Sequence, residues 1–296
     1  MEDRATVEVA GVAVVSAAVE DSGALAEEVP AVVAPAAAGS AFNRGLMVAE
    51  NKVPTKTIEE FVSRLRRAAG SNLLSVILYG SAAAGEFDPE FSDINLLCLL
   101  RQASFQTLAT LAPAIDWWHR QKQPTPLLMT GAELERSTDV FVIELMDLQS
   151  HHRVLYGEDM LERLAISTQF HRVQVEYELR EKLILLRQRM LLAAGNDGKL
   201  WELMFRSLSA FAALFRHALL LLGERAPQSK REVLHLAAAR FGFDISSLEQ
   251  ILNVREHKVK SKELDAKDIA GRYLSAVEQV TAAVDKILDS PGPRSS

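Results

Sequence analysis

Hydrophobic residues follow two different periods in the first half of the chain. From Ile58 to Leu65 they recur every three or four positions, which predicts a helix, and Thr57 is placed to start it through a capping box with Glu60. The run at 73–79 is almost continuously apolar, which indicates a strand buried on both faces, and a second apolar run from Ile94 to Leu100 predicts a strand over 92–100. The remaining pattern predicts a helix over 104–119, a strand over 126–130, a strand or the start of a helix over 139–148, and a short strand or loop over 153–157.

After about residue 168 the apolar pattern becomes helical throughout. Val175, Leu179, Leu183, Leu186 and Met190 form one stripe along a long helix, and a Gly-Asn-Asp-Gly sequence ends it. Short connections separate this helix from four further ones, which is typical of a helical bundle. The five helices are predicted over 173–194, 200–222, 229–239, 245–252 and 261–288.

These patterns together predict an α+β fold, in which a small mixed sheet with flanking helices is followed by an α-helical bundle. We place the first domain at 55–165 and the bundle at 168–289. Residues 1–54 are rich in Ala, Val and Glu and show no sustained period, which predicts a disordered tail. A weakly helical segment that docks on a partner is the alternative for this tail.

Composition and charge narrow the classes of function. Hydrophobic residues make up 48% of the chain, and the net charge of −6 argues against charge-driven binding to extended nucleic acid. The basic stretch 255–262 is expected to be a charged loop rather than an anion or RNA contact. The apolar stretch 9–19 is about half of the roughly 20 residues that span a membrane, so we expect no membrane partner. The single cysteine, Cys98, is consistent with a reducing, cytoplasmic location.

Two short motifs carry the candidate chemistry. Gly80 and Ser81 stop the first apolar run, and Asp93 and Asn95 open the second. Residues two apart in a strand share a face and lie about 6.6 Å apart, so two oxygen-bearing side chains at this spacing can approach one Mg²⁺ site. The Gly-Ser turn can lay backbone N–H groups against phosphate. The pair of motifs therefore predicts a site for a phosphorylated ligand and Mg²⁺.

This arrangement resembles the nucleotidyltransferase superfamily that includes DNA polymerase β and the aminoglycoside nucleotidyltransferases. The family pattern is a hydrophobic residue, Gly, Gly or Ser, about ten residues, and then Asp-hydrophobic-Asp/Glu-hydrophobic; here it lies within residues 57–159. The resemblance implies a polymerase-β-like fold of bacterial type, with Gly80 and Ser81 on the phosphates and Asp93 on Mg²⁺. Asn95 stands where the family has a second carboxylate, and an amide oxygen brings no charge to a metal.

The resemblance also implies site residues later in the chain. The family places a third carboxylate on a neighbouring strand, where it binds metal or acts as the base. The predicted strand over 126–130 has no acidic residue, so Glu144 is the first candidate and Asp147 the second. Lys230, at the start of a bundle helix, is assigned to phosphate or an anionic acceptor, against the alternative of a solvated helix terminus.

The function implied by the resemblance is binding of an NTP with Mg²⁺ between the two domains and transfer of NMP to a hydroxyl of a small molecule or a protein. A catalytically degenerate nucleotide-binding or regulatory module is the alternative, and a pure interaction protein is the third interpretation. A second acid that converges on Asp93 favours an enzyme, and its absence favours the degenerate module. The sequence leaves open the acceptor, the base preference and whether the chain forms a homodimer.

Overall fold

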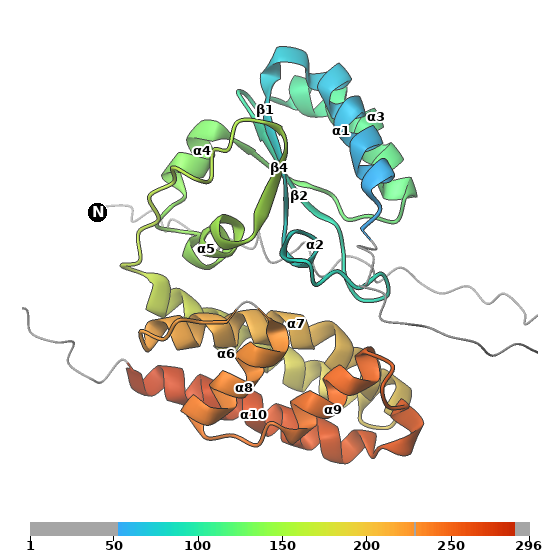
Figure 1. The fold of residues 1–296 in the computed structure, drawn as a ribbon, viewed down its shortest axis with the longest axis vertical. Helices are drawn as coiled ribbons and strands as arrows, with labels where there is room; N and C mark the ends of the chain where they lie inside the picture. The colour runs from blue at the N-terminus through green and yellow to red at the C-terminus, as the bar shows by residue number, and fades with distance from the viewer. Residues whose placement is uncertain (1–52, 228, 288–296) are drawn as a thin grey trace, which may run out of the picture.

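The computed structural model describes residues 53–227 and 229–287 and consists of two parts, one stacked on the other (Figure 1). The predicted tail lies outside the described residues up to position 52, and Val53 is buried in the core of the first part. The first part combines a sheet with helices, as the sequence predicts. Its elements are α1 (Thr55–Ala69), a 3₁₀ turn (Gly70–Asn72), β1 (Leu73–Tyr79), α2 (Ser81–Ala84), β2 (Asn95–Leu100), α3 (Phe105–Arg120), β3 (Leu127–Thr130), α4 (Gly131–Arg136), α5 (Val142–Ser150) and β4 (His152–Gly157).

The four strands form one mixed sheet in the order β3-β2-β1-β4. Strand β1 is antiparallel to both of its neighbours, and β2 is parallel to β3. Tyr79, at the end of β1, lies opposite Asn95 of β2 on one side and His152 of β4 on the other. In antiparallel pairs opposed residues share a face, so these three side chains belong to the same face of the sheet.

Each face of the sheet carries its own helical layer (Figure 1). Helices α1 and α3 cover one face, where Trp118 stacks on Phe61 with ring centroids 4.4 Å apart. Helices α4 and α5 cover the other face, where Leu145 and Leu148 of α5 pack against Ile77 of β1. Because β1 is covered on both faces, its sequence is a continuous apolar run, and the strand prediction over 73–79 is confirmed.

Helix α5 settles the ambiguity over 139–148 in favour of a helix. Its residue Ile143 packs into the core of the helical bundle, whereas Leu145 and Leu148 pack under the sheet. A short helix buried on two sides shows no single apolar stripe, which is why its period did not distinguish it from a strand. Helix α5 therefore lies between the sheet and the bundle.

The start of α1 differs from the prediction. The helix begins at Thr55 and follows Pro54, and no side chain caps it, so the capping box assigned to Thr57 and Glu60 is wrong. Pro54 is the N-cap residue, with φ −75° and ψ 70°, and its carbonyl accepts a hydrogen bond from the backbone N–H of Ile58 at 3.2 Å. The side chains that do form a capping box are Thr130 and Glu133, at the start of α4.

The second part of the molecule is a helical bundle built around α7. This helix packs against α6, α8, α9 and α10, and its residues Leu208, Phe211 and Phe215 lie in the bundle core. By length and composition α7 is also the one described helix that could cross a membrane, but half of its most apolar stretch is buried inside the protein. The bundle elements are α6 (His171–Ala193), α7 (Asp197–Leu221), α8 (Lys230–Phe241), α9 (Ser246–Arg255), a 3₁₀ turn (Ser261–Glu263) and α10 (Ala266–Ile287).

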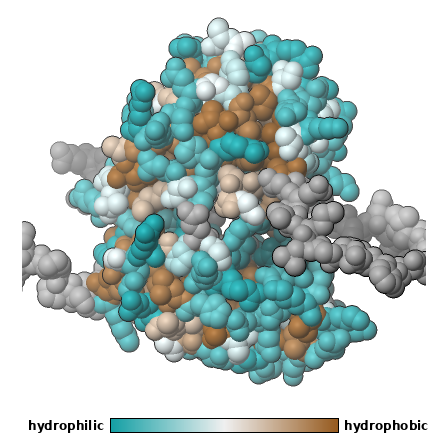
Figure 2. All heavy atoms as spheres, viewed as in Figure 1, coloured by the Kyte–Doolittle hydropathy of each residue, from teal (hydrophilic) through white to brown (hydrophobic). Residues whose placement is uncertain are grey.

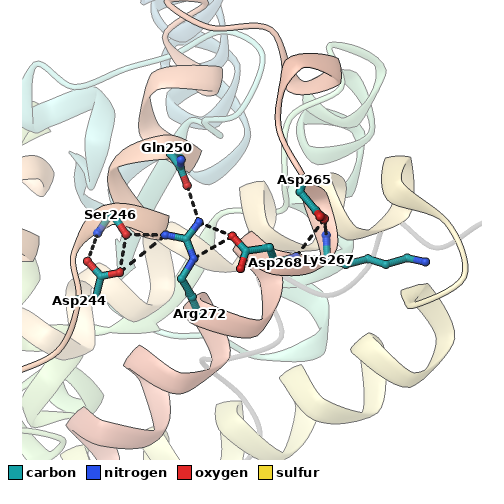
Figure 3. Close-up of polar contacts among 7 residues, drawn as sticks. All are labelled: Asp244, Ser246, Gln250, Asp265, Lys267, Asp268 and Arg272. Atoms are coloured by element: carbon teal, nitrogen blue, oxygen red, sulfur yellow. Dashed lines mark hydrogen bonds and ion pairs between the residues drawn. The ribbon is translucent and has the colours of Figure 1, made fainter.

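Polar contacts fix the outer surface of the bundle. The Arg272 guanidinium of α10 donates to Gln250 Oε1 at 3.0 Å and to Ser246 Oγ at 2.5 Å on α9, and it is paired with Asp268 one turn earlier (Figure 3). The face seen in Figure 2 is largely hydrophilic, with small hydrophobic groups scattered over both parts. The α+β fold with a C-terminal bundle is therefore confirmed.

Candidate functional site

The end of β1 is shaped by a glycine. Gly80 has φ 71° and ψ −152°, a conformation that side-chain-bearing residues rarely adopt, and it turns the chain from β1 into α2. A Cβ atom at this position would lie 3.1 Å from Nδ2 of Asn95. Both the backbone conformation and the close approach of Asn95 thus require glycine here. The predicted phosphate residue Gly80 and the predicted metal residue Asn95 are in direct proximity.

Ser81 follows at the first position of α2. Its side chain is half-buried, and its hydroxyl makes no hydrogen bond to the described residues. The Gly80 carbonyl accepts hydrogen bonds from the backbone N–H groups of Ala83 and Ala84, both at 3.0 Å, which closes the turn. The Ser81 hydroxyl therefore remains available to a ligand at the strand end.

Asp93 lies just outside the strand that was predicted to hold it. Strand β2 begins at Asn95, not at Ser92, because Ser92 closes a turn with Asp88 and the N–H of Ile94 donates to Gln123 Oε1 instead of to a strand. The same-face geometry of a strand therefore does not fix the direction of Asp93 relative to Asn95. Asp93 is exposed and has neither a hydrogen bond nor an ion pair with the described residues.

Glu144 lies in a different environment from the one its predicted role requires. It belongs to the first turn of α5, not to a strand, and its charged neighbours are Glu178, Asp147 and His217. Burial raises the pKa of the Glu144 carboxyl, as do the two neighbouring carboxylates. Its Oε2 atom is buried without a hydrogen-bond partner in the described chain. The contacts of Glu144 thus face helices α6 and α7 of the bundle, and none of them is to Asp93.

Lys230 faces the first domain. Its backbone N–H, at the start of α8, donates to Glu86 Oε1 at 3.0 Å, and Glu86 lies in the loop that leaves α2. A carboxylate at the start of a helix is also favoured by the helix dipole. Burial lowers the pKa of the Lys230 ammonium and so does the nearby Arg255, while Glu86 and Asp88 act in the opposite direction. A partly desolvated cation therefore lies beside the loop that joins Ser81 to Asp93.

Arg255 is a residue of this region that the sequence analysis did not identify. Its guanidinium is buried, lies 4.7 Å from the centre of the Phe91 ring, and donates to the Phe205 carbonyl at 3.3 Å and to Ser209 Oγ at 3.2 Å. Burial lowers the pKa of this guanidinium. The sequence contains one signal for the burial of Arg255. It falls four residues after Ile251, so the two residues lie on the same, buried side of α9.

The loop over 85–93 is thereby attached to the bundle at three points. Phe91 contacts Arg255 and also Phe205, whose ring is tilted by 53° with its centroid 5.4 Å away, and Glu90 pairs with His257 at 3.4 Å. Glu86 holds the start of α8 as described above. This loop connects helix α2, which begins at Ser81, to Asp93, so the bundle helps to set the geometry of the candidate site.

A second polar cluster joins the domains on the α5 side. Asp147 accepts a hydrogen bond from His217 Nε2 at 2.6 Å and another from Arg216, and His217 Nδ1 lies 2.8 Å from His171 Nε2. A small pocket of about 120 Å³ opens beside it, lined in part by Asp147, His151 and Arg216. Asp147 is the second candidate for the third carboxylate. Its side chain is hydrogen-bonded to Arg216 and His217 of α7.

The donor set at the strand end can be compared with what Mg²⁺ requires. Among residues 53–227 and 229–287, no three His, Cys, Asp or Glu side chains are grouped so that they could hold a metal ion. Asp93 and Asn95 together offer one carboxylate and one amide oxygen. This set suits an ion whose other ligands are phosphate oxygens and water, since protein-bound Mg²⁺ commonly keeps only one or two protein carboxylates. It does not suit a site with two protein-held ions.

Comparison with known proteins gives one family match. Residues 56–149 match the family model described as nucleotidyltransferase domain. This range includes Gly80, Ser81, Asp93, Asn95 and Glu144. No curated protein matches the sequence of the chain.

Two solved structures show distant likeness. Spectinomycin adenyltransferase AAD(9) from Enterococcus faecialis, solved with ATP and spectinomycin, is 14% identical, with a TM-score of 0.48 over 76% of this chain and 99% of that one. A nucleotidyltransferase-like protein from Exiguobacterium sibiricum is 13% identical, with a TM-score of 0.31 over 78% of each chain. At these scores the likeness carries no weight of its own, and the identification depends on the family match.

Proposed function

We propose, on the premise that residues 56–149 form a nucleotidyltransferase domain, that the protein binds an NTP with Mg²⁺ at the end of β1 and transfers NMP to a hydroxyl group. The single observation that carries the proposal is the junction at Gly80. A glycine in a left-handed conformation lies close to Asn95, and it is followed by Ser81, whose hydroxyl makes no hydrogen bond within the described part of the chain. The acceptor is a small molecule or a protein.

Each residue has a physical role in this proposal. The absence of a side chain at Gly80 lets phosphate approach the backbone, and the Ser81 hydroxyl donates a hydrogen bond to a phosphate oxygen. Lys230 supplies positive charge from the bundle, and its partial burial strengthens the attraction to phosphate. Asp93 and Asn95 would hold Mg²⁺, which when bound neutralises phosphate charge.

A second candidate function is supported by the number of acids. Asn95 stands where the family pattern has a carboxylate, and the charged groups that act on Glu144 belong to α5, α6 and α7. Strand β3, the neighbour of β2, carries Leu127 beside Leu97 and has no acidic residue. Asp93 is then the one acid assigned to the site. These observations favour a module that binds nucleotide without turning it over.

Titration calorimetry with ATP and GTP, with and without Mg²⁺, tests binding. We expect Mg²⁺-dependent binding by the wild type, and roughly tenfold weaker binding by Lys230→Ala, about 1.4 kcal/mol. Lys267→Ala is the matched control, because Lys267 is an exposed lysine at the start of α10, and its affinity should equal that of the wild type. No heat at millimolar nucleotide, or equal losses in the two variants, would overturn the proposal.

Transfer is measured separately from binding. The protein is incubated with NTP labelled at the α-phosphate, Mg²⁺ and a panel of hydroxyl-rich aminocyclitols, and label on the panel or on the protein itself is counted. Label that disappears in Asp93→Ala supports the transferase. Tight Mg²⁺-dependent binding with no labelled product from any acceptor supports the non-catalytic module.

A further inference from the structure

Helix α6 carries two apolar stripes on opposite sides. One stripe, which includes Val175, Leu179, Leu183 and Leu186, is buried against the rest of the bundle. The other stripe is exposed. Its members and their exposed fractions are Phe170 49%, Val173 52%, Tyr177 60%, Ile184 54%, Leu191 82% and Leu192 83%.

The exposed stripe has the spacing of a helix–helix contact. Phe170, Tyr177, Ile184 and Leu191 follow one another at intervals of seven residues, and Val173 adds the intermediate position of the first interval. At 100° per residue this series stays on one side of the helix, opposite the buried stripe. When a helix has apolar residues on two opposite sides, both sides are usually covered by other parts of the structure. The described chain covers only one side of α6.

We propose that the exposed stripe of α6 packs against the α6 stripe of a second copy of this chain, antiparallel, around a two-fold axis that passes between residues 180 and 181. Such an axis places Tyr177 opposite Ile184 of the second copy, and Phe170 opposite Leu191. The same contacts occur twice, as an isologous dimer requires. In this orientation each apolar residue of the seven-residue series therefore lies opposite another apolar residue of the same series.

Charge on α6 selects the antiparallel orientation. The half that ends at Glu181 carries three acidic residues and two arginines, a net charge of −1, whereas the half that begins at Lys182 carries three basic residues and no acid, a net charge of +3. An antiparallel pair brings unlike halves together, and a parallel pair would bring like halves together. At the axis, Arg180 of one copy meets Glu181 of the other. Arg180 already contacts Glu176 and Asp285 of its own chain, so its head group is held in place at this position.

The exposed area is adequate for a stable dimer. At the fractions given above, the six side chains present on the order of 600 Å² per copy, and a standard interface buries about 800 Å² per partner. The apolar stripe supplies most of that area, and the flanking charged residues of α6 supply the polar rim. The largest apolar patch on a typical monomer measures about 300–600 Å², and the stripe lies at the upper end of that range.

Sedimentation equilibrium of the full chain between 1 and 100 μM tests the proposal. We expect a mass of twice 32.6 kDa for the wild type. Ile184→Arg, at an exposed position near the axis, should weaken association at least tenfold and leave the melting temperature of the monomer unchanged. Phe105→Arg, which changes an apolar residue on α3 that is more exposed than Ile184, should leave the dimer intact. A monomeric wild type, or a dimer that Ile184→Arg does not weaken, would overturn the proposal.

The orientation is tested by a distance. A spin label on Leu192→Cys reports the separation of the two copies of this position, and the natural Cys98 is buried and does not compete. With 1.5 Å of rise per residue, the antiparallel pair predicts about 35 Å between labels, whereas a parallel pair predicts roughly 10 Å. The short distance would contradict the axis proposed here. Monomers that bind lipid vesicles, and that no longer bind them when they carry Ile184→Arg, would assign the stripe to a membrane surface instead.

Discussion

The hydrogen-bonded series Asp147–His217–His171 makes the junction of the two domains sensitive to acid. Asp147 belongs to α5 of the first domain, and the two histidines belong to α7 and α6 of the bundle. Burial, and then the charge of His217, lowers the pKa of His171 from 6.5 to about 4, although Asp147 acts in the opposite direction. Acidification must therefore place a proton on a buried imidazole that the folded state keeps neutral.

The direction and the size of the change in stability with pH follow from the pKa of His171. In the unfolded chain His171 binds its proton near pH 6.5, and in the folded protein near 4. Between these values the unfolded state binds more protons, so stability is complete above pH 6.5 and falls as the pH drops toward 4. At 1.36 kcal/mol per pH unit, the loss amounts to about 3 kcal/mol. That is a large part of the total stability of an ordinary domain.

Urea unfolding at several pH values between 7 and 4.5 measures this loss. The wild type is compared with His171→Gln, whose amide can still donate to His217 Nδ1 but does not titrate. We expect the variant to lose about 2 kcal/mol less than the wild type over this range, where His171 contributes most of its effect. His235→Gln, on the exposed side of α8, is the control and should lose as much as the wild type. An equal loss of unfolding free energy in the wild type and in His171→Gln as the pH falls would refute the reasoning.

Three further predictions concern the acids and the glycine of the site. Glu144→Gln should raise the free energy of unfolding at pH 7, because burial and two neighbouring carboxylates disfavour the ionised form, and the gain should vanish near pH 4 in the same urea assay. Gly80→Ala should lower thermal stability by about 1–3 kcal/mol through its left-handed conformation and its contact with Asn95, and should abolish the calorimetric signal of nucleotide. Asn95→Asp should tighten Mg²⁺-dependent nucleotide binding and lower the stability of the metal-free protein; unchanged Mg²⁺ affinity would mean that Asn95 does not face the ion.

The fold could be predicted from the sequence for those elements whose residues are uniformly buried. Strand β1 has the predicted bounds because it is covered on both faces, and α3 and α8 begin after the serines Ser104 and Ser229 that cap them. The apolar period of α6 also identified its buried stripe, since Val175 and Leu183 pack into the bundle as expected. In each case one local interaction, burial or capping, decides the structure.

Where two interactions compete, the structure was predicted less accurately from the sequence. Apolar continuity extended the second predicted strand back to Ser92, but a side-chain and backbone turn with Asp88 ends the loop there and delays the strand to Asn95. Arg255 was grouped with a charged loop because of its neighbours in sequence. It is buried because Phe91 arrives from the other domain to cover it, and a contact between domains leaves no local pattern.

The two halves of the candidate site match the family pattern to different degrees, and this difference bears on function. The phosphate half keeps Gly80 in its left-handed turn, the unpaired Ser81 hydroxyl, and Lys230 across the domain junction. The acidic half has an amide at Asn95 and leucines on the strand beside it. Affinity for a nucleotide depends mainly on the first half, whereas activation of an acceptor hydroxyl depends on the second. The residues present therefore suffice for nucleotide binding, whereas transfer requires an acid to reach Asp93 when nucleotide is bound, which the labelled-NTP assay would detect as product.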